Sequence, residues 1–409
     1  CHAGIAATDT CNNIYIGKEA GAQNCSCYSC GNIAIGHKAL CHSPSNTNAI
    51  AIGCCAGYFH STSYLIAIGC KAGKCAANPG IYIGLRAGEN GGAGSHVLIG
   101  VNAGKSHGNA GGYNVMVGNN SGCGNRCGCS NVFLGGGSAQ GNYDGSCNIA
   151  IGRCSGPYTV NEGNGSFNFS GGWRTGSCIL TGNSNVFIGV SAGVGYTSGS
   201  NNISIGATVG PQICGASGNY NIAFGYETGN GITSGSDNIS IGRSTGSNIT
   251  GGGNNILLGR CSGIKQTTAF SNVLLGSCVG RDLTTGGTNI GIGRLALDGV
   301  LTGTYNVAIG YRAGRSQYSA SLGVPDATQN IAIGYDAGDT AIQGGQNQNI
   351  FLGYKAGDGL VQGLPLALLV QIIMIIYSLV QILVIRVMCV VYIVEMLLLV
   401  IELVIVQLE

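Results

Sequence analysis

Apolar and polar residues alternate in a short motif that recurs along most of this chain. Its general form is Asn-Ile-x-Ile-Gly-x-x-Ala-Gly, and the copies occur between residues 13 and 357, most often 17 residues apart. We call the first glycine of each copy the coil glycine. The twenty coil glycines are Gly17, Gly36, Gly53, Gly69, Gly84, Gly100, Gly118, Gly135, Gly152, Gly172, Gly189, Gly206, Gly225, Gly242, Gly259, Gly276, Gly293, Gly310, Gly334 and Gly353. A short repeat of this kind predicts stacked structural units instead of a single globular core.

The residues before each coil glycine predict one short strand per copy. The residue three positions before it is always apolar, and the residue one position before it is apolar in every copy except at Gly171. The residue between them varies freely, as Tyr15, Ser204 and Leu257 show. Such a period of two is typical of a half-buried strand. We therefore expect both constant positions to face inward and the variable position to face solvent or a partner.

The residues after each coil glycine predict a tight corner. The side chain three positions after it is always small, and a second glycine usually follows, with Leu40, Ala139 and Leu297 as the exceptions. Small residues beside glycine suit a backbone that needs a positive φ and leaves no room for the next unit.

Asparagine stands at the head of the strand in sixteen of the twenty copies. In stacked strands about 4.8 Å apart, these amides could bond to one another and to turn backbone groups, which predicts an asparagine ladder. The alternative is that asparagine merely favours turns, which is also a structural role. The predicted ladder consists of Asn13, Asn32, Asn114, Asn131, Asn148, Asn168, Asn185, Asn202, Asn221, Asn238, Asn255, Asn272, Asn289, Asn306, Asn330 and Asn349.

These patterns predict an all-β fold, a β-solenoid (β-roll or β-helix) of about twenty coils with a modal period of 17 residues. One coil cannot cover its own apolar face, so each must be stabilised by its neighbours. Twenty coils would form a rod on the order of 95 Å long. We expect residues 1–12 to be an N-terminal fragment or cap, because the chain starts at a cysteine, and residues 13–363 to be the solenoid. Insertions, the longest at 311–329, should project as loops.

The strand-and-corner motif resembles the YadA-like head repeats of trimeric autotransporter adhesins and related repeats of viral and phage fibre proteins. The match covers residues 13 to 357 and is closest at Asn-Ile-Ala-Ile-Gly, at 148–152 and 330–334. The resemblance implies a left-handed β-roll, three chains wound side by side, and attachment to a surface or host.

The apolar segment 364–409 has no glycine and no asparagine. As written it is atypical of the repeat, and the run from Leu366 to Ile385 is long enough for a transmembrane helix. The favoured explanation is a frameshift. In that case the gene is read in the wrong frame here, and each true codon consists of the third base of one codon as read and the first two bases of the next. Read in this second frame, the codons of residues 375–380 permit Asn-Ile-Phe-Ile-Gly, and those of residues 395–404 permit a second complete motif. Sequencing the gene would decide between a frameshift and a transmembrane helix.

The charge and the cysteine content limit which partners and which kinds of site we expect. Only 8% of the residues are charged and the net charge is +2, so we expect no nucleic-acid partner. The twenty cysteines suggest disulfides that close loops in an oxidising compartment. Metal binding is the alternative, since all six histidines lie in the same half of the chain; we expect no metal and no cofactor. Candidate disulfide cysteines are Cys25, Cys27, Cys30, Cys123, Cys127 and Cys129. Five others follow a coil glycine and are interpreted as incidental: Cys54, Cys70, Cys154, Cys261 and Cys278.

The predicted function is a non-enzymatic structural or adhesive fibre, a rigid shaft or head whose loops attach to a surface or host. Its expected partners are copies of itself, as a homotrimer, and an unidentified surface receptor or glycan; a membrane is a partner only if 364–409 is genuine. The expected location is extracellular, on a cell or virion surface. The alternatives are a polysaccharide-cleaving β-helix of tailspike type, which needs carboxylates converging across adjacent coils, and a membrane-anchored surface repeat protein.

Overall fold

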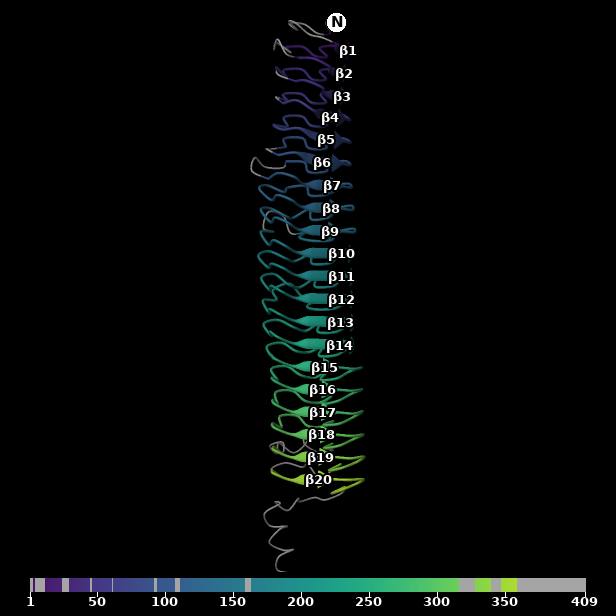
Figure 1. Cartoon of the computed structure of the whole chain (residues 1–409), viewed down its shortest axis with the longest axis vertical. Helices are drawn as coiled ribbons and strands as arrows, with labels where there is room; N and C mark the ends of the chain where they lie inside the picture. The colour runs from purple at the N-terminus through teal and green to yellow at the C-terminus, as the bar shows by residue number, and fades with distance from the viewer. Residues whose placement is uncertain are drawn as a thin grey trace, which may run out of the picture.

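The chain forms a β-solenoid in which twenty short parallel strands stack into one sheet along a rod (Figure 1). The computed structural model describes residues 12–23, 29–44, 46–60, 62–91, 94–106, 111–158, 163–315, 328–339 and 347–358, together with residue 3. Predictions for the N-terminal cap, the insertion at 316–327 and the segment 364–409 lie outside the described residues. Among the residues described, no helix has the length and apolar character needed to cross a bilayer.

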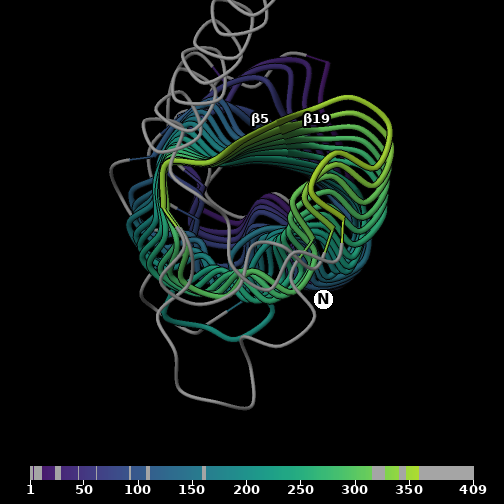
Figure 2. The same cartoon turned by 90° about the horizontal axis from the view of Figure 1, so that it is seen from below.

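Each strand pairs with the strands of the preceding and following copies of the motif, always in the same register. Ile33 pairs with Ile50, for example, and Gly189 pairs with Gly206. Viewed along the rod axis, the coils stack around a common axis and fan out progressively from one end to the other (Figure 2). The predicted β-solenoid fold is therefore confirmed.

The strands are three to five residues long and each contains the two constant positions of the motif. Their bounds are β1 Ile14–Ile16, β2 Ile33–Ile35, β3 Ile50–Ile52, β4 Leu65–Ile68, β5 Gly80–Ile83, β6 His96–Ile99, β7 Val115–Val117, β8 Val132–Leu134, β9 Ile149–Ile151, β10 Phe169–Trp173, β11 Val186–Val190, β12 Ile203–Ala207, β13 Ile222–Tyr226, β14 Ile239–Arg243, β15 Ile256–Leu258, β16 Val273–Leu275, β17 Ile290–Ile292, β18 Val307–Ile309, β19 Ile331–Ile333 and β20 Ile350–Leu352.

The coil glycines form a column in which neighbouring coils touch through their backbones. Gly36 has a φ of +128°, and a Cβ added there would lie 2.7 Å from the carbonyl oxygen of Gly53. No L side chain fits that geometry. The predicted corner is also confirmed, because even its three non-glycine residues have positive φ: 47° at Leu40, 47° at Ala139 and 54° at Leu297.

The side-chain orientation of the strands is the reverse of the prediction. The variable middle residue points into the coil: Phe133, Ser204 and Leu257 are all fully buried. The two constant aliphatic residues point outward and are only partly covered, with Ile188 at 40% exposure and Ile292 at 37%. The expectation that these aliphatic pairs seal the interior is therefore wrong, although their stacking is confirmed.

The physical reason is that the middle position varies to fill a narrow interior. At β17 the middle residue is Gly291, and a Cβ there would lie 2.6 Å from Cγ1 of Val279 and 3.2 Å from Cδ1 of Leu297. The corner residue that is usually glycine is Leu297 in this coil, so a larger corner side chain compensates for the smaller strand residue. Variation at the middle position therefore reflects volume exchange inside the rod, not contact with solvent.

The asparagine ladder is present along the rod. The Asn185 Oδ1 accepts the backbone N–H of Asn202 at 2.9 Å, and the Nδ2 of Asn185 donates to the carbonyl of Gly199 at 2.9 Å. The Nδ2 of Asn202 also donates to Asn185 Oδ1 at 3.1 Å, so the amides bond to one another. Fifteen of the sixteen predicted asparagines are buried, and Asn13 is half-buried. These bonds satisfy backbone groups that burial would otherwise leave unpaired.

Candidate attachment face

The outward side of the sheet is a continuous apolar surface, which we call the aliphatic face. It consists of the two constant residues of each strand from β1 to β20, and Gly171 is the only member without a side chain. Many of these side chains are about two fifths exposed, including Ile151 at 41% and Ile350 at 42%. At about 50 Å² each they present on the order of 2,000 Å², whereas the largest apolar patch on a typical monomer is a few hundred Å².

Exposed aromatic residues border the aliphatic face at a corner just before the strand. They occupy the position that precedes the head-of-strand residue, and they stand three coils apart at β4, β7, β10 and β13: Tyr64, Tyr113, Phe167 and Tyr220 are 59% to 75% exposed. A fifth, Tyr305, precedes β18. All five have positive φ, between 56° and 65°. Bulky side chains are rare in this backbone conformation, so their recurrence there is a candidate functional feature.

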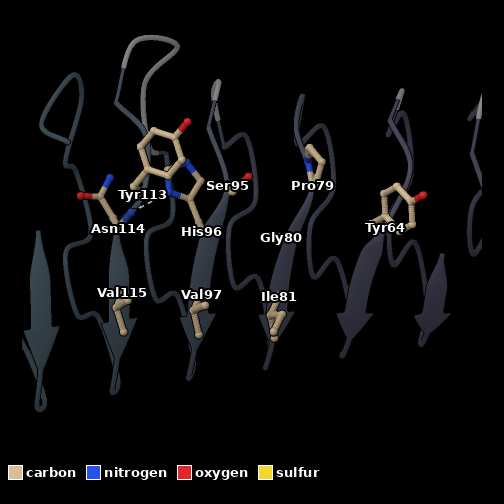
Figure 3. A pocket seen from close by; sticks show the side chains of 10 residues that line it. All are labelled: Tyr64, Pro79, Gly80, Ile81, Ser95, His96, Val97, Tyr113, Asn114 and Val115. Carbon is tan, nitrogen blue, oxygen red and sulfur yellow. Dashed lines mark hydrogen bonds between the residues drawn. The ribbon is translucent and has the colours of Figure 1, made fainter. Parts of the chain in front are cut away.

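Between Tyr64 and Tyr113 the surface is hollowed into a groove of about 360 Å³, which we call the corner bay. Figure 3 shows the two tyrosines at its ends, with Pro79 and Ser95 at the corners of the two coils between them. Ile81 and Val97 lie below, on the aliphatic face. The lining contains no carboxylate, lysine or arginine, and its volume falls within the range of small-molecule sites.

The corner bay lies where the asparagine ladder is interrupted. The head-of-strand residues of β3 to β6 are Ala49, Leu65, Gly80 and His96. A Cβ at Gly80 would meet the Tyr82 hydroxyl at 2.8 Å, so this coil has no space for a larger residue. Small residues at 79–80, between two large aromatic corners, leave the depression. His96 Nδ1 accepts the N–H of Asn114 at 3.3 Å and so restarts the ladder.

Two carboxylates converge across adjacent coils, at Asp282 and Asp298. Both contact Arg281, with distances of 3.2 Å to Asp282 and 3.1 Å to Asp298, and Lys265 also pairs with Asp282 at 2.5 Å. Burial alone would raise the pKa of Asp282, but hydrogen bonds and charge from Lys265 and Arg281 lower it below its usual range. Burial raises the pKa of Asp298 despite Arg281. The shared guanidinium makes this pair an ionic clip between coils.

The cysteine pairing differs from the prediction. Cys30, Cys123, Cys127 and Cys129 are free thiols, contrary to expectation, and Cys25 and Cys27 lie outside the described residues. Within the part of the chain that the structure describes, a disulfide joins Cys178 to Cys214, with a Cα–Cα distance of 5.7 Å. It connects loops 36 residues apart, and the sequence gives no pairing signal beyond the presence of the two cysteines.

Comparison of the chain with protein-family models, with curated proteins and with solved structures finds no match. The site must therefore be interpreted from its own geometry. Sequence reasoning missed the aliphatic face because it assigned those side chains to the interior. It also missed the corner aromatics, although aligning the copies on the coil glycine would have placed all five in one column, the first four of them three coils apart.

Proposed function

We propose that this chain is a structural and adhesive fibre element whose rods associate side by side through the aliphatic face, most simply as a homotrimer. The observation that carries the proposal is the twenty-strand apolar surface. Burying roughly 2,000 Å² per chain would match large permanent interfaces, which are also the more hydrophobic ones. The residues of the face carry no charge, so association costs no desolvation of buried ions.

The mass of the full chain in solution tests this proposal. Light scattering should give a small integral multiple of the one-chain mass of 41.2 kDa. The double substitution Ile188→Lys and Ile222→Lys places charges on the face and should release single chains, because each unpaired ammonium resists burial. Ile213→Lys is the matched control: this side chain is 84% exposed and lies off the strands, so the assembly should persist.

Circular dichroism must show that the double variant keeps its strand content. A wild-type chain with the one-chain mass would contradict the proposal. So would a folded double variant that assembles as fully as the Ile213→Lys control.

For attachment, we propose that the corner bay holds a neutral sugar unit of a surface glycan. The supporting observation is the pair of tyrosines at the ends of an uncharged groove, with Ser95 between them. Aromatic rings stack against the apolar faces of sugars while hydroxyl groups fix their orientation. Acidic glycans are disfavoured, since the lining contains no lysine or arginine.

Binding to a panel of neutral and acidic oligosaccharides tests this second component. Tyr64→Ala and Tyr113→Ala should each weaken binding of the neutral sugar at least tenfold. Tyr220→Ala is the control, because Tyr220 occupies the equivalent corner of β13 and lies outside the bay. Equal losses in all three variants, or binding confined to acidic sugars, would refute the sugar assignment.

The proposed role is non-enzymatic, and we place it outside the cell or on a virion surface. The Cys178–Cys214 bridge supports an oxidising location. The polysaccharide-cleaving alternative requires carboxylates free to act on a glycosidic bond. Asp282 and Asp298 are engaged by Arg281, which favours the structural role. Activity on a polysaccharide that is lost in Asp298→Asn would reverse this conclusion.

A further inference from the structure

Three metal-ligating side chains come together on the outer surface near the start of the rod. Cys54 Sγ lies 3.7 Å from Cys55 Sγ and 3.9 Å from Nδ1 of His37. All three ligand atoms lie within 4.8 Å of one another. His37 and Cys54 are exposed and Cys55 is half-buried, so an ion could reach them from solvent.

The stacking of the coils places these groups. His37, Cys54 and Cys70 each follow a coil glycine, so they form a column across the coils of β2, β3 and β4. The N–H of Cys55 donates to the carbonyl of His37 at 2.9 Å, which ties the first two coils together. The N–H of Lys71 donates to the carbonyl of Cys54 at 2.8 Å, which ties the next two. Cys70 follows Cys54 in this column, but the ligand atoms that lie within 4.8 Å of one another are those of His37, Cys54 and Cys55.

The spacing of the three ligand atoms matches tetrahedral coordination. Two Zn–S bonds of about 2.3 Å at a tetrahedral angle place their sulfurs about 3.8 Å apart, and a Zn–S and a Zn–N bond place sulfur and nitrogen about 3.6 Å apart. The observed 3.7 Å and 3.9 Å are close to both values. We propose that His37, Cys54 and Cys55 bind a thiophilic divalent ion of the Zn²⁺ class, and that the exposed Cys70 side chain turns toward the ion to become the fourth ligand.

The local charges are compatible with such an ion. The two lysines beside the cluster have acidic partners: Lys38 lies 3.6 Å from Glu19, and Lys71 lies 3.9 Å from Glu89.

The site would act as a staple where the amide ladder is interrupted. It joins the coils of β2, β3 and β4, and the head-of-strand asparagine is absent from β3 to β6. An ion that binds the folded coils and not the unfolded chain raises the stability of those coils. The metal thus adds a link between coils at the opposite end of the strand from the missing head-of-strand amides.

Cobalt titration of the full chain, prepared reduced and free of metal, tests the site. One equivalent of Co²⁺ should produce the sulfur-to-cobalt charge-transfer band and the visible bands of a tetrahedral thiolate site, and Zn²⁺ should abolish them. Cys54→Ser with Cys55→Ser should weaken binding at least about 100-fold, and His37→Gln at least about tenfold. Cys70→Ser should reduce the charge-transfer intensity.

The matched control is Cys261→Ser with Cys278→Ser, which removes two thiols from the corresponding corner of the coils after β15 and β16. The cobalt spectrum of this control should be unchanged. A wild-type chain without tetrahedral bands, or equal loss in the control, overturns the proposal, and an unchanged Cys70→Ser spectrum overturns the fourth ligand. If the double cysteine variant does not fold, the exposed His37→Gln variant decides, because it must also lose the rise in melting temperature that Zn²⁺ gives the wild type.

Discussion

The coils of β10 to β20 and the coils of β3 to β6 solve the same stacking problem in different ways. In the first group every strand has an asparagine at its head, and the Oδ1 of one accepts the backbone N–H of the next, as between Asn255 and Asn272 at 3.0 Å. In the second group the head residue is not asparagine. There the strands β4, β5 and β6 begin one residue earlier, and Leu65 pairs with Gly80 as a regular strand residue.

This difference shows what the ladder does. The side-chain amide substitutes for one rung of the backbone ladder at the head of the strand, and where the amide is missing the backbone rung takes its place. The N–H of Ala49 donates to Asn32 Oδ1 at 3.0 Å, and β3 accordingly begins at Ile50, like a strand of the first group. Both arrangements keep the register, because both groups share the column of coil glycines.

The largest expected loss of stability comes from substitutions in the shared column of coil glycines. Gly53→Ala in the interrupted group and Gly276→Ala in the other should cost similar amounts, about 4 kcal/mol each, from backbone strain plus overpacking. A Cβ would lie 2.7 Å from the carbonyl oxygen of the next coil glycine at Gly53 and 2.9 Å at Gly276. Chemical denaturation measures the loss.

The control for strain alone is Gly215→Ala. Gly215 has a similar φ of +125° but nothing within 4 Å of an added Cβ. The Gly215→Ala substitution should lower the free energy of unfolding by only about 1–2 kcal/mol. If Gly53→Ala were no worse than this control, or much milder than Gly276→Ala, the glycine column could not be the common feature of the two groups.

Acid should destabilise the coils of β3 to β6 more than the coils of β10 to β20, because of a buried histidine. His60 follows β3 and is fully buried; its Nδ1 contacts the carbonyl oxygen of Ala76 at 2.7 Å and its Nε2 contacts the Thr62 hydroxyl at 3.2 Å. Burial lowers the pKa of His60 from 6.5 to about 4. Between these values the unfolded chain takes up a proton that the folded coil does not, so stability falls as pH drops from 6.5 to 4, by about 3 kcal/mol.

Hydrogen exchange at pH 7 and at pH 4.5 measures this loss coil by coil. Protection should decrease around β3 to β5 and change less in β10 to β20, because every histidine lies at or before His107. In His60→Gln the acid-dependent part should disappear. Uniform loss along the rod, or acid loss that persists in His60→Gln, would contradict this account.

The next largest loss of stability should come from removing one interior asparagine of the unbroken ladder. In Asn202→Ala the N–H of Asn221 and the carbonyl of Gly218 lose their partners at 2.9 Å each, and both lie in a buried part of the rod. Leaving such groups unpaired should cost about 2–3 kcal/mol. Asn202→Ser, which can keep one of the bonds, is the comparison. A cost below 1 kcal/mol in denaturation would mean that backbone rungs replace the amide there too.

The period, the register and the asparagine ladder could be predicted from the sequence. Each depends on a residue type that has one main structural role at its position. Glycine tolerates the φ of +128° at Gly36, and asparagine alone repeats at the head of the strand. The inward side of the strand could not be predicted, because alternation defines two faces without saying which is buried. Variation from Ala34 to Phe133 looks like solvent tolerance, whereas it reflects exchange of volume inside the coil.

The candidate site was less predictable for a related reason. The corner bay and the metal-ligand cluster depend on residues that share a column across coils, and single copies do not reveal them. Cys54 was interpreted as incidental because other copies carry varied residues at its position, yet His37 and Cys70 occupy the same column in the coils on either side. Alignment of all the coils carries this information, whereas the consensus motif removes it.

The smallest expected loss of stability comes from removing Asn13, the half-buried asparagine of the ladder. Asn13 makes the same kinds of bond as Asn202: its Oδ1 accepts the N–H of Asn32 at 2.7 Å, and its Nδ2 donates to the carbonyl of Ser29 at 2.8 Å. Because water can reach this partly exposed rung, Asn13→Ala should cost only about 1 kcal/mol. Denaturation of the two alanine variants side by side then measures the effect of burial on one hydrogen-bond pattern. Equal costs at Asn13 and Asn202 would mean that bond geometry, and not desolvation of the unpaired groups, determines what a rung contributes.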